Sequence, residues 1–186
     1  LTKKIIQERV GIDDVFLDIG ANVGYFSAIA SQLVGEDGKV FSIEANPNIH
    51  DLLKLNLPYG NVKVLNTAVG NHSGKIDFFL TKDLVNSGVA PSPFGLSSQK
   101  IAVSISTLDQ LFEEGCFGDK PINFIKCDVQ GDEVAVLEGA ARLIAESERL
   151  AVMVEWAPTW MKSSGFHDFI VLPKLLSEYG FKEIFA

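Results

Sequence analysis

The residues best suited to chemistry are a glycine-containing turn and a carboxylate that follows it at a distance. The turn is Asp18-Ile-Gly20-Ala-Asn22-Val-Gly24, which lies where an apolar run meets a helical pattern. Glycine lets backbone approach a ligand closely, and the free N–H groups at the start of a helix can donate to a carboxylate. Asn22 stands where the fingerprint Gly-x-Gly-x-x-Gly has the glycine that admits a pyrophosphate. The turn therefore favours a smaller charged group, such as an amino-acid carboxylate; a plain strand-to-helix turn is the competing interpretation.

The distant carboxylate is Glu44, which ends the second apolar run of the chain. In a doubly wound sheet an acid at this place accepts hydrogen bonds from both hydroxyls of a ribose. It would repel a 2′-phosphate, so a free 2′-hydroxyl is implied. The competing interpretation is an exposed carboxylate at the end of a strand.

A lysine and two acids form a second candidate group. Lys126 lies between Ile125 and Cys127 in an expected central strand, where an unpaired ammonium is costly to bury. We expect Lys126 to meet Glu155, at the end of the neighbouring strand, or another acid; the alternative is a lysine that extends past the sheet edge into solvent. Asp128 follows at the carboxyl edge, where such sheets bind ligands. It is the first candidate for catalytic or substrate contact, with helix capping as the alternative.

The remaining acids near this edge do not indicate a metal site. Asp132 and Glu133 follow Asp128 closely, and with Glu155 they make a group of four carboxylates. No pair among them has a spacing specific to metal ligands. We therefore expect no metal.

Alternating apolar runs and helical patterns predict βαβ units and a parallel sheet. The stretch Val85 to Gln99 between two strands is rich in glycine, proline and serine, and is either a lid or binding loop or a simple surface excursion. We expect strands at 15–19, 40–43, 62–65, 75–80, 101–105, 150–154 and 181–185, and a further central strand to which residues 122–125 lead and which contains Lys126. We expect helices at 25–34, 48–56, from 107, at 133–145 and at 169–176.

Length and composition predict one globular domain over residues 1–186. The net charge of −8 disfavours a nucleic-acid partner. The longest apolar run, Leu150 to Val154, is far too short to cross a membrane. Two cysteines are too few for a disulfide scaffold and indicate a reducing, cytoplasmic compartment. The first residue is Leu1 and the last lies in an apolar stretch, which suggests a piece of a longer chain.

Several ordered motifs resemble the FkbM family of S-adenosylmethionine-dependent methyltransferases. They run in family order from about residue 15 to residue 156. The motifs are Leu17-Asp-Ile-Gly-Ala-Asn-Val-Gly-Tyr-Phe-Ser27, Ile43-Glu-Ala-Asn-Pro47, Asn66-Thr-Ala-Val-Gly70, Ser106-Thr-Leu-Asp109, Phe124-Ile-Lys-Cys-Asp-Val-Gln-Gly-Asp-Glu133 and Val152-Met-Val-Glu155.

This resemblance implies the class I methyltransferase fold, an α/β, Rossmann-like, doubly wound and mostly parallel sheet of seven strands with helices on both faces. It also implies methyl transfer from S-adenosylmethionine to a hydroxyl of a glycan or small molecule. The residues themselves, rather than the resemblance, make Asp128, Lys126 and Glu155 the catalytic candidates. In the cofactor site, the methionine and ribose part would be lined by Asp18, Gly20, Ala21, Asn22 and Gly24. Glu44 would hold the ribose, and the adenine would be flanked by Ala45 and Ala68. The amino group of the methionine and the reacting centre would face Asp128 and Val129.

Two departures from the family pattern bear on this assignment. Gln130 replaces the glutamate usual in the Asp-Val-Glu-Gly segment, on the acceptor side, and Ala45 stands where proline is common. A strand pairing antiparallel with the sixth is not evident near the end of the sequence.

Three other functions compete with a small-molecule methyltransferase. A nicotinamide-dependent oxidoreductase needs the glycine that Asn22 replaces. A domain that binds S-adenosylmethionine without catalysis gains weight from Gln130. A methyltransferase acting on nucleic-acid bases typically has an Asn/Asp-Pro-Pro-aromatic segment where Asp128-Val-Gln-Gly131 stands. The motifs do not exclude an enzyme that methylates ribose oxygen, although the acidic pI counts against it.

Overall fold

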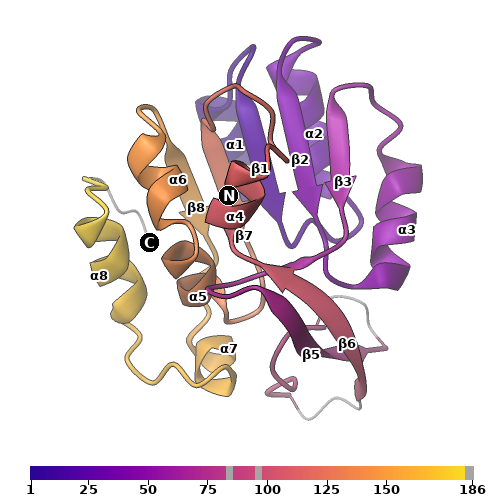
Figure 1. Ribbon diagram of the computed structural model, residues 1–186, viewed down its shortest axis with the longest axis vertical. Helices are drawn as coiled ribbons and strands as arrows, with labels where there is room; N and C mark the ends of the chain where they lie inside the picture. The colour runs from indigo at the N-terminus through magenta and orange to yellow at the C-terminus, as the bar shows by residue number, and fades with distance from the viewer. Residues whose placement is uncertain (83–85, 95–97, 183–186) are drawn as a thin grey trace.

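A parallel sheet of five strands forms the centre of the protein (Figure 1). The computed structural model describes residues 1–82, 86–94 and 98–182. The strands are β1 (Val15–Ile19), β2 (Lys39–Ile43), β3 (Val62–Leu65), β7 (Phe124–Cys127) and β8 (Ala151–Val154), in the order β3-β2-β1-β7-β8. All five residues of β1 are buried, which explains its nearly continuous apolar sequence, because a central parallel strand is covered on both faces.

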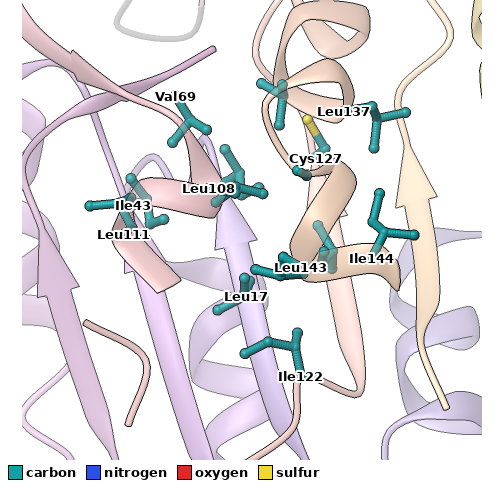
Figure 2. Close-up of a cluster of buried hydrophobic side chains, with 14 of the residues drawn as sticks. Leu17, Ile43, Val69, Leu108, Leu111, Ile122, Cys127, Leu137, Leu143 and Ile144 are labelled. Carbon is teal, nitrogen blue, oxygen red and sulfur yellow. The ribbon is translucent and has the colours of Figure 1, made fainter. Parts of the chain in front are cut away.

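Helices cover both faces of this sheet, and the alternation of side chains along β1 divides the core accordingly. Phe16 packs with α1 (Thr2–Arg9) and α2 (Tyr25–Val34) on one face. Val15, Leu17 and Ile19 point to the opposite face, where the main core cluster lies (Figure 2). That cluster includes side chains from α4 (Leu108–Glu113), α5 (Glu133–Glu138), α6 (Ala141–Glu146) and α8 (Val171–Glu178).

Two further helices shape the ends of the strands. α3 (Pro47–Asn56) begins directly after β2, with the Asn46 side chain accepting a hydrogen bond from the N–H of Asn48 at 3.1 Å. α7 (Pro158–Ser163) follows β8. No helix in the described residues is long and apolar enough to span a membrane.

A second, smaller sheet lies beyond the strand ends of the first (Figure 1). It contains β4 (Ala68–Val69), β5 (Gly74–Thr81) and β6 (Ser98–Ser106) in the order β4-β6-β5. β5 and β6 are antiparallel, and β4 runs parallel to β6. The mostly parallel, doubly wound α/β fold is thus confirmed, but the strands in the described part of the chain divide into five and three rather than forming a single sheet of seven. The reason is that β4, which follows β3, pairs with β6 and has a separate small core.

The expected helix over 133–145 is two helices, α5 and α6, with Gly139 between them. A Cβ at Gly139 would lie 2.1 Å from the carbonyl oxygen of Gly70, and the Gly139 carbonyl accepts the N–H of Asp109 at 2.9 Å. These contacts come from segments distant in sequence, so helical periodicity alone could not indicate the break.

The last helix begins two residues later than expected, at Val171, because the Asp168 carboxylate accepts the N–H of Ile170 and forms a turn first. The strand expected at 181–185 lies mostly outside the described residues, and Phe181 and Lys182 are not in a strand. Within the expected loop 85–99, Gly88 pairs with Phe79 through two backbone hydrogen bonds of 2.8 and 3.2 Å. Part of that loop therefore folds back onto β5.

Candidate active site at the carboxyl edge of the sheet

A cleft of about 310 Å³ opens where β1, β2 and β7 end. Its volume lies in the range of small-molecule sites, and its position is the one at which open α/β sheets bind ligands. Of the residues predicted for the site, those that line the cleft are Gly20, Ala21, Asn22, Glu44, Ala45, Ala68, Lys126, Asp128 and Val129. The sequence did not single out Thr67, Val69 and Phe78, which also line it.

The glycine turn after β1 has a backbone shape that requires glycine. Gly20 has φ of +73°, and a Cβ there would lie 1.9 Å from the carbonyl oxygen of Asp128. The N–H groups of Gly20 and Ala21 both donate to the carbonyl of Ile43 at 3.0 Å. Asn22 also has a positive φ, of +51°, a conformation that asparagine adopts more readily than most residues. The turn is therefore held between the ends of β2 and β7.

Glu44 joins this turn directly. Its Oε2 accepts the N–H of Asn22 at 2.9 Å, and its Oε1 accepts the N–H of Asn46 at 2.8 Å. Glu44 is 9% exposed; burial raises the pKa of its carboxyl, and the two backbone hydrogen bonds oppose that rise. Each carboxylate oxygen has a second acceptor site, so Glu44 can still accept hydrogen bonds from a ligand.

A row of buried polar side chains lies beneath the cleft. Strand register places Asp18 between Ser42 on β2 and Lys126 on β7. Ser42 Oγ donates to Ser27 Oγ at 2.7 Å, and Ser27 Oγ donates to Asp18 Oδ2 at 2.7 Å. Asp18 is 0% exposed. It therefore supports the cleft from below rather than lining it.

Lys126 is paired inside the protein. Its Nζ lies 3.1 Å from Asp18 Oδ1, 3.7 Å from Asp128 Oδ2 and 5.3 Å from the centre of the Phe26 ring. Burial works against the charge, but the two carboxylates outweigh it and raise the pKa of Lys126. With 4% exposure, the lysine does not reach past the sheet edge. The expectation of an acidic partner is confirmed, and the closest partner is Asp18 rather than Glu155.

Asp128 and Glu155 lie next to each other because β7 and β8 are paired neighbours in register, with Cys127 opposite Val154. The amide Nε2 of Gln130 donates to Asp128 Oδ1 at 3.0 Å and to Glu155 Oε2 at 3.4 Å. Burial is the main reason that the pKa of Glu155 rises to about 7, and the charge of Asp128 adds to it. Glu155 does not line the cleft itself, but Gln130, which does, connects it to Asp128.

The loop between β7 and α5 is organised by Glu133, a role that the sequence did not reveal. The Glu133 carboxylate accepts the N–H groups of Val129 at 3.0 Å and Gly131 at 3.1 Å. Asp132 accepts a hydrogen bond from Ser164 Oγ at 2.9 Å, and burial raises its pKa to about 7. The contacts of the Asp128 side chain are with the cleft residues rather than with the start of α5. No cluster of three or more potential metal ligands occurs in the described ranges.

Residues 18–183 match the model of the methyltransferase FkbM domain. The hexuronic acid methyltransferase AglP of Haloferax volcanii is 32% identical over 145 residues, which are 73% of this chain and 54% of that protein. The chain thus spans about half the length of this curated relative.

Two solved structures show the same fold. The methyltransferase FkbM of Methylobacillus flagellatus has 19% identity and a TM-score of 0.53, over 89% of this chain and 37% of that one. A SAM-dependent O-methyltransferase of Thermotoga maritima has 16% identity and a TM-score of 0.53, over 95% of this chain and 49% of that one. The class I methyltransferase fold inferred from the motifs is therefore confirmed.

Proposed function

The chain belongs to the FkbM methyltransferase family, and on this premise we propose that it transfers a methyl group from S-adenosylmethionine to a hydroxyl oxygen of a sugar, a glycan or another small molecule. The observation that carries the proposal is the hydrogen bond of 2.9 Å between the glycine turn and Glu44, at the wall of the cleft. It places a ribose-binding acid beside a turn suited to an amino-acid carboxylate.

The residues around the cleft fit the cofactor. Glu44 offers acceptors for the two ribose hydroxyls, and Ala45 and Ala68 supply small apolar walls for a flat base. Phe78, whose ring lines the same cleft, adds apolar surface there. When bound, S-adenosylmethionine supplies a methyl group on a sulfonium, which is a good leaving group.

The acceptor hydroxyl must come within about 3 to 3.5 Å of the methyl carbon and lose its proton. The Asp128–Glu155 pair is the proton acceptor in this proposal. The pKa of about 7 for Glu155 suits a base that works near neutral pH. Lys126 orients Asp128 from 3.7 Å. A base of this kind contributes about 10² to 10⁴ in rate.

The acceptor class rests on two observations. The curated relative is named a hexuronic acid methyltransferase, which supports a saccharide. The net charge of −8 disfavours nucleic acid, although a putative rRNA methylase of Clostridium thermocellum shares the fold with a TM-score of 0.56. A reducing, cytoplasmic compartment remains part of the proposal, supported by two free cysteines.

The proposal that the cleft binds S-adenosylmethionine is tested by calorimetry with S-adenosylhomocysteine and, separately, with NAD. The wild type should bind the first and not the second. Glu44→Gln should weaken binding about tenfold or more, because hydrogen bonds to a charged acceptor contribute about 1.5 to 3 kcal/mol. Glu36→Gln, an exposed change of the same kind, should bind like the wild type. Preferential binding of NAD would contradict the proposal.

The proposal that the protein transfers a methyl group is tested with radiolabelled S-adenosylmethionine and a panel of neutral glycosides, uronic acids and RNA. Label should appear in an ether at a hydroxyl of a saccharide. Cofactor binding without transfer to any acceptor would indicate a domain that only binds the cofactor, and would overturn the proposal that the protein is an enzyme. Label in RNA alone would overturn the acceptor class. Melting curves of each variant ensure that lost binding does not reflect unfolding.

A further inference from the structure

Gln130 lies at the junction of three segments. It follows β7, has a left-handed backbone with φ of +60° and lines the cleft. A side-chain carbon at Gly88, in the segment bridged to β5, would lie 3.6 Å from Gln130 Cβ. The next residue, Gly131, lies so close to α7 that a Cβ would be 2.5 Å from the Trp160 carbonyl. Gln130 therefore lies between the segment bridged to β5 and the α7 helix.

The amide of Gln130 is directed at two carboxylates that would otherwise repel each other. Nε2 lies 3.0 Å from Asp128 Oδ1 and 3.4 Å from Glu155 Oε2. Burial, and with it the charge of Asp128, raises the pKa of Glu155 to about 7. One neutral donor thus bridges the two acids.

We propose that Gln130 is a positioning residue that holds Asp128, at the cleft, and Glu155, behind it, together as one proton-accepting pair. The role of the pair in catalysis rests on the proposed function. The bridging of the two carboxylates by Gln130 does not. It also accounts for the departure from the family pattern, because a glutamate at position 130 would bring a third carboxylate to the same two groups, whereas an amide can donate to both.

Other charges act on the pair and must be held constant in a test. Lys126 approaches Asp128 from β7 with Nζ at 3.7 Å and attracts the pair's negative charge. Glu133 on α5 repels it. Asp18 on β1 neutralises part of the Lys126 charge from behind. All three are the same in a variant altered only at Gln130.

The test is a pH titration of the side-chain carboxyl carbon of Glu155 by NMR, in the protein without cofactor. In the wild type its pKa should lie near 7, because the group is buried and faces the charge of Asp128. Gln130→Met, which has similar length but no donor, should move this pKa higher by about half a unit to one unit. Gln130→Glu should move it further, by about one to two units.

A matched control is Gln32→Glu, an exposed change on α2 that adds the same charge away from the cleft. Its titration should follow the wild type. If methyl transfer is measurable, the acidic limb of kcat/KM should shift in the same order: wild type, then Gln130→Met, then Gln130→Glu.

A pKa of Glu155 near the ordinary value of a glutamate in the wild type would overturn the proposal, as would Gln130 variants in which Glu155 titrates as in the wild type. The wild-type measurement stands even if a variant does not fold. A titration that responds to Gln130 in a protein that transfers no methyl group would support the positioning role and count against the proposed function alone. The two failures are therefore distinguishable.

Discussion

Replacing Lys126 with methionine should destabilise the protein far more than the loss of one surface charge would. Methionine keeps the unbranched apolar stem and removes only the ammonium. The change leaves the Asp18 carboxylate, which is 0% exposed, with a hydrogen bond from the hydroxyl of Ser27 at 2.7 Å but without its ammonium partner. We expect the free energy of unfolding at pH 7 to fall by about 3 to 5 kcal/mol, because the removal of one partner leaves an uncompensated buried charge.

The distance between the charges gives the same magnitude. Two unit charges 3.1 Å apart, as Lys126 Nζ and Asp18 Oδ1 are, attract by about 5 kcal/mol at an effective dielectric constant of about 20. A swap of similar volume without charge would cost less than about 1.5 kcal/mol. The electrostatic contribution therefore decides the outcome.

The second variant, Asp18→Asn combined with Lys126→Met, separates the charge from the packing. It removes the unpaired carboxylate, so the double variant should be more stable than Lys126→Met alone, with a coupling of about 1 to 3 kcal/mol between the two sites. Lys39→Met, at an exposed position on β2, should stay within about 0.5 kcal/mol of the wild type.

The assay is urea denaturation followed by circular dichroism at pH 7. A loss below about 1 kcal/mol at pH 7, or a double variant no more stable than Lys126→Met, would refute the electrostatic account of this lysine.

Three further changes test other parts of the site. Gly20→Ala should lower the free energy of unfolding by at least about 2 kcal/mol and abolish binding of S-adenosylhomocysteine, because Ala must adopt a positive φ and meet the Asp128 carbonyl. The control in thermal melts is Gly60→Ala, because a Cβ at Gly60 has nothing within 4 Å. Asp132→Asn should remove a pH dependence. Folding raises the pKa of Asp132 from 3.8 to about 7, so the folded state binds more protons, and wild-type stability should fall by about 4 kcal/mol relative to the variant as pH rises through that window. Asn46→Ala should lose about 1 kcal/mol in denaturant unfolding, because the α3 cap is lost.

The parts of the fold that could be predicted are those that depend on short-range patterns. The apolar run of β1 marked a strand covered on both faces, and Thr107 marked the start of α4, where its hydroxyl accepts the N–H of Gln110 at 3.0 Å. The helix break at Gly139 was missed because its cause is the backbone of Gly70. The division into two sheets was missed because nothing within β4 itself indicates that it pairs with β6.

The site shows the same limit. The glycine turn and Glu44 were found because each sits directly at the end of a strand whose pattern is clear. That Lys126 needed an acidic partner followed from its apolar neighbours, but the choice of Asp18 depends on the register between β1 and β7. The bridging role of Gln130 depends on its backbone conformation and on β8 lying next to β7, neither of which local sequence specifies.

The balance of ionisable groups in the cleft bears on how turnover ends. Among the described residues, Glu44, Asp128 and Asp132 contribute three carboxyl groups to its lining, against the one ammonium of Lys126. Such a surrounding attracts a cationic sulfonium more than the neutral thioether that remains once the methyl group has gone. We therefore expect the charge of the cleft to favour exchange of the spent nucleoside for a fresh one.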